Sequence, residues 1–162
     1  MTDTAGRIGQ PDVEYQLVTT FDAPRDVVFR AWTDPAQLTH WFAPRGFSTP
    51  IEHIRLDVRP GGSWQAEIWR GDEPASRLAG TYVDVDPPER LVFTTGDPAD
   101  RNGAPASVVT VALVESAGRT EMRFWQAGYN TGQDHADRAR AGWQEFFDRL
   151  GEYLVSGASG KN

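Results

Sequence analysis

The sequence predicts an α+β fold in which a curved antiparallel sheet wraps around one long C-terminal helix. Two observations carry this prediction: strand-like alternation recurs between about residues 48 and 127, and an amphipathic helical pattern follows over 133–155. Consecutive strands joined by tight turns form antiparallel sheets. One face of such a sheet must be covered, and the C-terminal helix is the only predicted element long enough to cover it.

A strand and two short helices are expected first. Residues 13–21 alternate between apolar and polar side chains, which is typical of a strand. Pro24 suits the first turn of a helix, and Trp32 lies on that helix's apolar side. Asp34, followed by a proline, is a good N-cap for a second short helix, which must end near Pro44.

Six further strands are predicted, separated by turns rich in Pro, Gly and Asp. They are 48–58, 62–69, 77–85, 90–96, 107–115 and 119–127. A long Pro- and Gly-containing loop is expected between the fourth and fifth of them. With the first strand, the sheet has seven strands.

One domain is expected over 13–155, with a disordered tail over 1–12 and a flexible tail over 156–162, because both ends are small and polar. The net charge of −7 and the lack of a basic run disfavour a nucleic-acid or anionic-membrane partner. The sequence has neither a membrane-spanning apolar run nor a secretory signal, so a cytoplasmic location is the expectation.

Few residues offer catalytic chemistry. The chain has no cysteine, which excludes a disulfide framework, a thiolate-ligated metal and a thiol nucleophile. His40, His53 and His135 are scattered along the chain, and no metal-binding or nucleophile-elbow motif occurs. We therefore predict no metal and no organic cofactor.

Motifs in a fixed order carry a family resemblance. They are FDAPR at 21–25, VFRAWTDP at 28–35, WFAP at 41–44, DVRPGG at 57–62, GTY at 80–82, PERLVFT at 88–94, and Gly142-Trp143 with Leu150. In these the sequence resembles the Hsp90-ATPase-activator-homologue-like (AHSA1-like) family of the START-like, or SRPBCC, superfamily. The resemblance covers about residues 13–155. It implies a helix-grip fold, with seven strands gripping the C-terminal helix and two small helices closing one end.

The resemblance also implies a hydrophobic cavity between sheet and helix, which the superfamily uses for apolar molecules. The predicted inner face mixes aromatic, small and polar side chains, whereas a solid core would favour aliphatic ones. We therefore expect a small hydrophobic or aromatic molecule as partner, oriented by hydrogen bonds to Tyr82 and Gln126. The candidate ligand-binding residues are Trp41, Trp64, Ile68, Tyr82, Phe93, Met122, Phe124, Gln126, Trp143, Phe146 and Phe147.

Simpler interpretations stand beside this one. Each candidate side chain is also suited to plain core packing. The segment from Trp41 to Pro44 either lines the cavity mouth or anchors the second short helix. The glycines at 61–62 lack the Lys-Ser/Thr of a phosphate loop and indicate turn geometry.

Two other functions remain as alternatives. One is an aromatase/cyclase-type enzyme, for which Glu67, Tyr82, His53 or His40 would supply the acid or base. The other is a chaperone-accessory protein of the Hsp90 type, although the N-terminal activating domain of eukaryotic activators is not expected here. By parity Trp69 and Trp125 point outward, where they would form an exposed patch for a partner or cover a homodimer interface.

Overall fold

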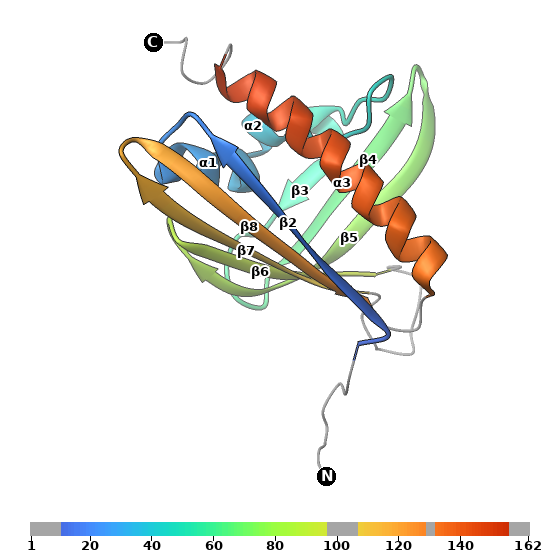
Figure 1. The fold of residues 1–162 in the computed structure, drawn as a ribbon. Coiled ribbons are helices and arrows are strands. Elements are labelled where there is room, and N and C mark those ends of the chain that lie inside the picture. Colours follow the sequence, from blue (N-terminus) through green and yellow to red (C-terminus); the bar gives the residue numbers. More distant parts are fainter. Residues whose placement is uncertain (1–10, 97–106, 129–131, 156–162) are drawn as a thin grey trace.

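A computed structural model describes residues 11–96, 107–128 and 132–155. It confirms the predicted fold: seven antiparallel strands curve around α3 (Gln133–Tyr153), and α1 (Arg25–Thr33) and α2 (Pro35–Leu38) close one end (Figure 1). Most of the predicted N-terminal tail, the C-terminal tail and the long loop after residue 96 lie outside the described residues.

The first strand in sequence lies at one sheet edge and pairs with the last. The strands are β2 (Val13–Phe21), β3 (Ile54–Leu56), β4 (Ser63–Arg70), β5 (Glu73–Asp86), β6 (Arg90–Thr95), β7 (Ser107–Ser116) and β8 (Arg119–Gly128). Their spatial order is β2-β8-β7-β6-β5-β4-β3. Apart from the β2–β8 closure, neighbours in the sheet are neighbours in sequence, as tight turns require.

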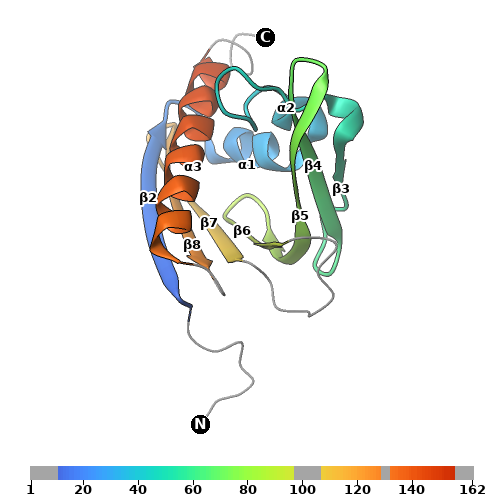
Figure 2. The same ribbon diagram turned by 90° about the vertical axis from the view of Figure 1, so that its right-hand side faces the viewer.

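The sheet bends within β5. The first part of β5, from Glu73 to Thr81, pairs with β4, and the remainder, from Tyr82, pairs with β6. A register shift lies between Tyr82 and Asp84, and such bulges increase local bending. Figure 2 looks into the resulting grip, with β2 and β8 on one side, β3 and β4 on the other, and α1 across its upper end.

The predicted strand over 48–58 is mostly wrong. Ser48 makes an isolated bridge to Trp69, η1 (Ile51–His53) is a 3-10 helix, and only β3 is regular strand. Pro50 explains the interruption, because it has no N–H for a ladder and its φ of −60° suits the start of a helical turn. The strand count of seven is nevertheless correct.

The core lies between the sheet and the apolar face of α3. Phe124 of β8 packs against Trp143 and Phe147, with ring centroids 4.8 and 5.1 Å apart. All three side chains are buried, as are Phe146 and Leu150 on the same helix face. Each buried aromatic or aliphatic side chain contributes about 1.5–3 kcal/mol, so this contact holds α3 to the sheet.

Candidate functional site

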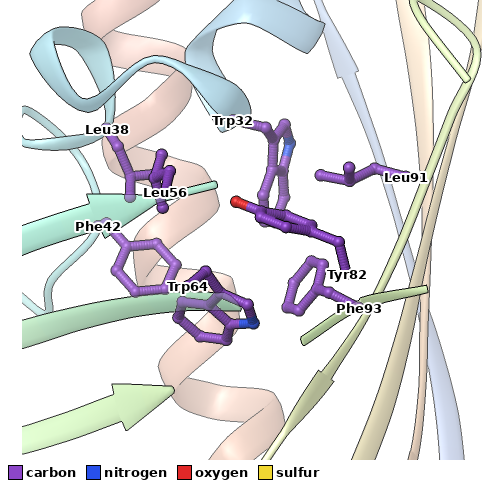
Figure 3. Close-up of a pocket in the computed structure, with 8 residues that line it drawn as sticks. All are labelled: Trp32, Leu38, Phe42, Leu56, Trp64, Tyr82, Leu91 and Phe93. Carbon is purple, nitrogen blue, oxygen red and sulfur yellow. The ribbon is translucent and has the colours of Figure 1, made fainter. Parts of the chain in front are cut away.

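An unfilled space of about 20 Å³ lies where the bent sheet meets the two short helices. We call it the aromatic cavity. Its walls come from α1, α2, the segment after α2, and strands β3 to β6. The lining residues are Trp32, Leu38, Phe42, Leu56, Trp64, Tyr82, Leu91 and Phe93 (Figure 3).

The cavity's rings are held in edge-to-face contacts. Trp64 meets Phe93 at 5.3 Å and 80°, and Phe42 meets Trp64 at 6.3 Å and 88°. Tyr82 meets Phe93 at 6.4 Å and 74°. Aromatic pairs prefer this geometry, so each ring fixes the orientation of the next.

Gly80 positions the Trp64 indole. The two residues are opposite each other in the β4–β5 register, and Trp64 Nε1 donates to the Thr94 carbonyl oxygen at 3.0 Å. A Cβ on Gly80 would lie 1.7 Å from that carbonyl oxygen and 2.9 Å from Trp64 Nε1. Only glycine therefore permits this close approach of β5 to the neighbouring strand.

The Tyr82 hydroxyl is the unusual polar group of the cavity. Tyr82 is only 3% exposed, and its oxygen points toward the interior of the ring of lining side chains (Figure 3). In the described part of the chain, no side chain or carbonyl is hydrogen-bonded to this hydroxyl, and its oxygen is not among the fully enclosed unpaired atoms, which are Trp32 Nε1 and Gln37 Oε1. Burial, aided by the nearby Asp57 carboxylate, raises the pKa of Tyr82 above its ordinary value of 10.0, so the hydroxyl stays protonated.

Residues 39–50, which we call the cover segment, follow α2; their Phe42 lines the cavity and also contacts Trp143 and Phe146 of α3. Within it, Thr39 Oγ1 donates to the Thr49 carbonyl and Thr49 Oγ1 to the Phe42 carbonyl. Arg149 of α3 donates to the carbonyls of Ala43, at 2.8 Å, and Pro44, at 3.3 Å. These bonds make the cover segment an internally tied unit.

Exposed contacts attach the cover segment to α3 more loosely. The Arg45 backbone N–H donates to Glu145 at 3.1 Å, and its guanidinium pairs with Glu152 at 2.6 Å. The pKa of Arg149 is lowered by partial burial and by the nearby Arg45. Ring contacts hold it as well: Phe42 meets Phe146 and Trp143 of α3 at 4.9 and 5.8 Å, and His40 stacks on Tyr153 at 5.0 Å. The cover segment is thus held to α3 by both aromatic and polar contacts.

A second space, of about 60 Å³, lies toward the N-terminal end of α3; we call it the polar cavity. Its lining residues are Val13, Tyr15, Thr95, Ser107, Gln126, Gly128, His135, Ala136 and Ala139. Here the polar groups satisfy one another. The Tyr15 hydroxyl donates to Gln126 Oε1, and Gln126 Nε2 donates to Ser107 Oγ at 2.8 Å.

Comparison with known families now identifies the fold. The family model described as "Activator of Hsp90 ATPase homolog 1-like protein" matches residues 22–155. The chain belongs to this family. No curated protein matches it.

Solved structures show the same AHSA1-like fold. An AHSA1 protein from Silicibacter pomeroyi is 24% identical, with a TM-score of 0.74 over 88% of this chain and 98% of its own. An AHSA1-like protein from Aeromonas hydrophila is 20% identical, with a TM-score of 0.75 over 93% of this chain and 97% of its own. An Hsp90 activator from Plasmodium falciparum is 18% identical, with a TM-score of 0.65 over 89% of this chain and 96% of its own. At these identities the similarity shows the fold alone.

The sequence-predicted site residues of this AHSA1-like chain fall into three places. Trp64, Tyr82 and Phe93 line the aromatic cavity, whereas Gln126 lines the polar cavity. Tyr82 and Gln126 therefore do not face one shared space. The others are buried in the core: Trp41, Ile68, Met122, Phe124, Trp143, Phe146 and Phe147.

Trp41 is anchored rather than cavity-lining. It is fully buried, its Nε1 donates to the Ala31 carbonyl at 3.1 Å, and its ring meets Trp32 edge-on at 4.9 Å. Its neighbour Phe42 lines the cavity instead.

Four cavity residues were missed from sequence: Trp32, Leu38, Leu56 and Leu91; Phe42 lay in the segment 41–44, for which lining the cavity mouth was one of two interpretations. Helical spacing assigned Trp32 and Leu38 to helix packing. Trp32 and Leu91 lie within the family motifs, which was the available signal for them; Leu38 and Leu56 lie outside those motifs.

The alternative acid–base candidates Glu67 and His53 lie on the outer side of β4. His53 Nδ1 is 3.3 Å from Glu67 Oε1, and the imidazole stacks on Trp69 at 4.9 Å. Glu67 alternates with the inward-facing Ala66 and Ile68, so it points away from the aromatic cavity. Among the described residues, no three His, Asp or Glu side chains gather where they could hold a metal ion.

The two outward tryptophans do not form one patch. Trp69 is half-buried beneath His53 and donates to Glu67 at 3.0 Å, while Trp125 is 41% exposed and donates to Glu14. They belong to β4 and β8, which three strands separate. In the described part of the chain, no helix is long and apolar enough to cross a membrane.

Proposed function

We propose that this AHSA1-like protein binds a small, largely apolar molecule in the aromatic cavity. The observation that carries the proposal is the cavity itself: aromatic and aliphatic side chains from seven elements converge on a space that they do not fill. Protein cores are normally packed to the density of organic crystals. A space at the junction of a bent sheet and two short helices suits a ligand.

Binding requires the cavity to enlarge. Its volume of about 20 Å³ accommodates about one water, whereas organic ligands occupy pockets of roughly 300 Å³ or more. We assign the enlargement to the cover segment, because part of its attachment to α3 is polar and exposed; its displacement must also break the contacts of Phe42 with Phe146 and Trp143. Its displacement would carry Phe42 out of the cavity and leave the strand-borne rings in place.

Ligand-induced stabilisation tests this function. Neutral apolar probes, such as cumene, indole and naphthalene, are added to the full chain while the melting temperature and tryptophan fluorescence are recorded. A ligand at a hundred times its Kd stabilises the folded state by about 2.7 kcal/mol, which raises the melting temperature by several degrees.

The control is Leu56→Trp, which fills the cavity. We expect it to abolish the temperature rise, while Val18→Trp on the exposed outer face leaves it unchanged. The proposal fails if no probe shifts the melting temperature, or if Leu56→Trp, shown to be folded by circular dichroism, binds as wild type does.

The homodimer, the cytoplasmic location and the two alternative functions stay predictions from the sequence. Gel filtration with light scattering tests the first of them directly.

A further inference from the structure

We infer that the ligand of the aromatic cavity is neutral and carries a hydrogen-bond acceptor, such as a carbonyl oxygen, which the Tyr82 hydroxyl binds. This inference rests on the proposed function and names the chemical class of its ligand. Figure 3 shows the geometry on which it depends: the Tyr82 oxygen faces inward among apolar side chains.

The direction of the Tyr82 hydroxyl is fixed by its surroundings. Tyr82 begins the part of β5 that pairs with β6, directly opposite Phe93, and the two rings meet edge-to-face. The ring is almost completely buried. This burial and the contact with Phe93 therefore hold the hydroxyl toward the cavity.

The other polar atoms of the cavity are indole N–H groups. Trp64 Nε1 already donates to the Thr94 carbonyl. Trp32 Nε1 is buried with no partner among the described residues, and in Figure 3 it lies on the Leu91 side of the ring. Indole nitrogens only donate, and the Tyr82 hydroxyl has a proton to donate. A ligand acceptor complements this set, whereas a ligand with donors alone leaves the Trp32 indole unmatched.

Charge excludes an ionised ligand. None of the described residues that line the cavity is Lys, Arg or His, and an unpaired charge is costly to bury. The Asp57 carboxylate, which acts on Tyr82 from nearby, is paired with Arg59 at 2.9 Å, so it is not free to hold a cation.

Three probes of nearly equal shape test the inference. Acetophenone carries a neutral acceptor, cumene replaces the carbonyl oxygen by a methyl group, and benzoate is the anion. We expect wild type to bind acetophenone and cumene, and benzoate at least tenfold more weakly than acetophenone at pH 7. Affinities are measured by fluorescence titration and by the melting-temperature shift.

The matched variants remove one hydroxyl each. Tyr82→Phe should weaken acetophenone binding about tenfold, the scale of one hydrogen bond, and change cumene binding less than about twofold. Tyr15→Phe, in the polar cavity, should change neither. A further measurement needs no variant: in the infrared spectrum, the carbonyl stretch of bound acetophenone should lie at lower wavenumber than that of acetophenone in an apolar solvent.

The failures are distinguishable. If no probe binds wild type, the proposed function falls and the inference with it. If cumene binds but Tyr82→Phe leaves acetophenone affinity unchanged, or the bound carbonyl stretch is unshifted, only the inference is overturned. Benzoate binding as tightly as acetophenone overturns the requirement for a neutral ligand.

Discussion

The aromatic cavity and the polar cavity are both bounded by the inner face of the sheet, yet they treat their polar groups differently. In the polar cavity, Tyr15, Gln126 and Ser107 form a hydrogen-bonded chain that satisfies itself. In the aromatic cavity, the Tyr82 hydroxyl borders the open space and is bonded to no other described residue. A closed network stabilises the fold, whereas a hydroxyl without a protein partner adds little to it and is left to pair with water or a ligand.

The largest effect is expected at Gly80, on which the shape of the aromatic cavity depends. Gly80→Ala places a Cβ against the Thr94 carbonyl and the Trp64 indole. We expect a loss of about 3 kcal/mol in the free energy of unfolding, since backbone must shift. Urea denaturation measures it.

Gly142→Ala is the matched control for this substitution. Its Cβ would meet nothing within 4 Å on α3, so this variant should gain up to about 1 kcal/mol. Equal stability of Gly80→Ala and wild type would contradict the assigned role of Gly80.

The next effect separates the two cavities directly. Gln126→Met keeps the side chain's volume but leaves the Tyr15 hydroxyl without its acceptor, which should cost about 2 kcal/mol. Tyr82→Phe removes a hydroxyl that has no partner and should change stability by less than about 0.5 kcal/mol. Thermal melts of both variants compare them, and a larger loss in Tyr82→Phe would reverse the contrast.

A smaller effect is expected at Arg149, which ties the cover segment to α3. Arg149→Gln loses the bonds to the Ala43 and Pro44 carbonyls and should cost about 1 kcal/mol. Amide hydrogen exchange within residues 39–50 should accelerate more than exchange in β7. Arg138→Gln, an exposed position on the same helix, is the control and should leave both rates unchanged.

The smallest effect near neutral pH is that of tyrosine ionisation. Burial raises the pKa of Tyr82 and Tyr15 above 10.0 in the folded state. Above about pH 10 the unfolded chain therefore releases protons that the folded chain keeps, so stability falls as pH rises. Urea midpoints between pH 8 and 11 should decline less steeply in Tyr82→Phe, and parallel curves would contradict the burial of this phenol.

Strand parity and helical spacing were sufficient to predict the architecture. The 3.6-residue pattern of Trp143, Phe146, Phe147 and Leu150 marked the buried face of α3 correctly. Alternation likewise placed Trp64 and Tyr82 on the inner face. The prediction of a strand over 48–58 was wrong because Pro50 changes the local backbone, an effect that the alternation of apolar and polar residues does not include.

The sequence by itself determined which side chains face inward, because that depends on periodicities of two and 3.6 residues within single elements. Only the tertiary structure decided that Tyr82 and Gln126 face different cavities, and that Phe42 rather than Trp41 lines the first. Those facts depend on the position at which β5 stops pairing with β4 and begins to pair with β6, and on how the cover segment packs against α3. Both are contacts between distant parts of the chain, which local pattern does not encode.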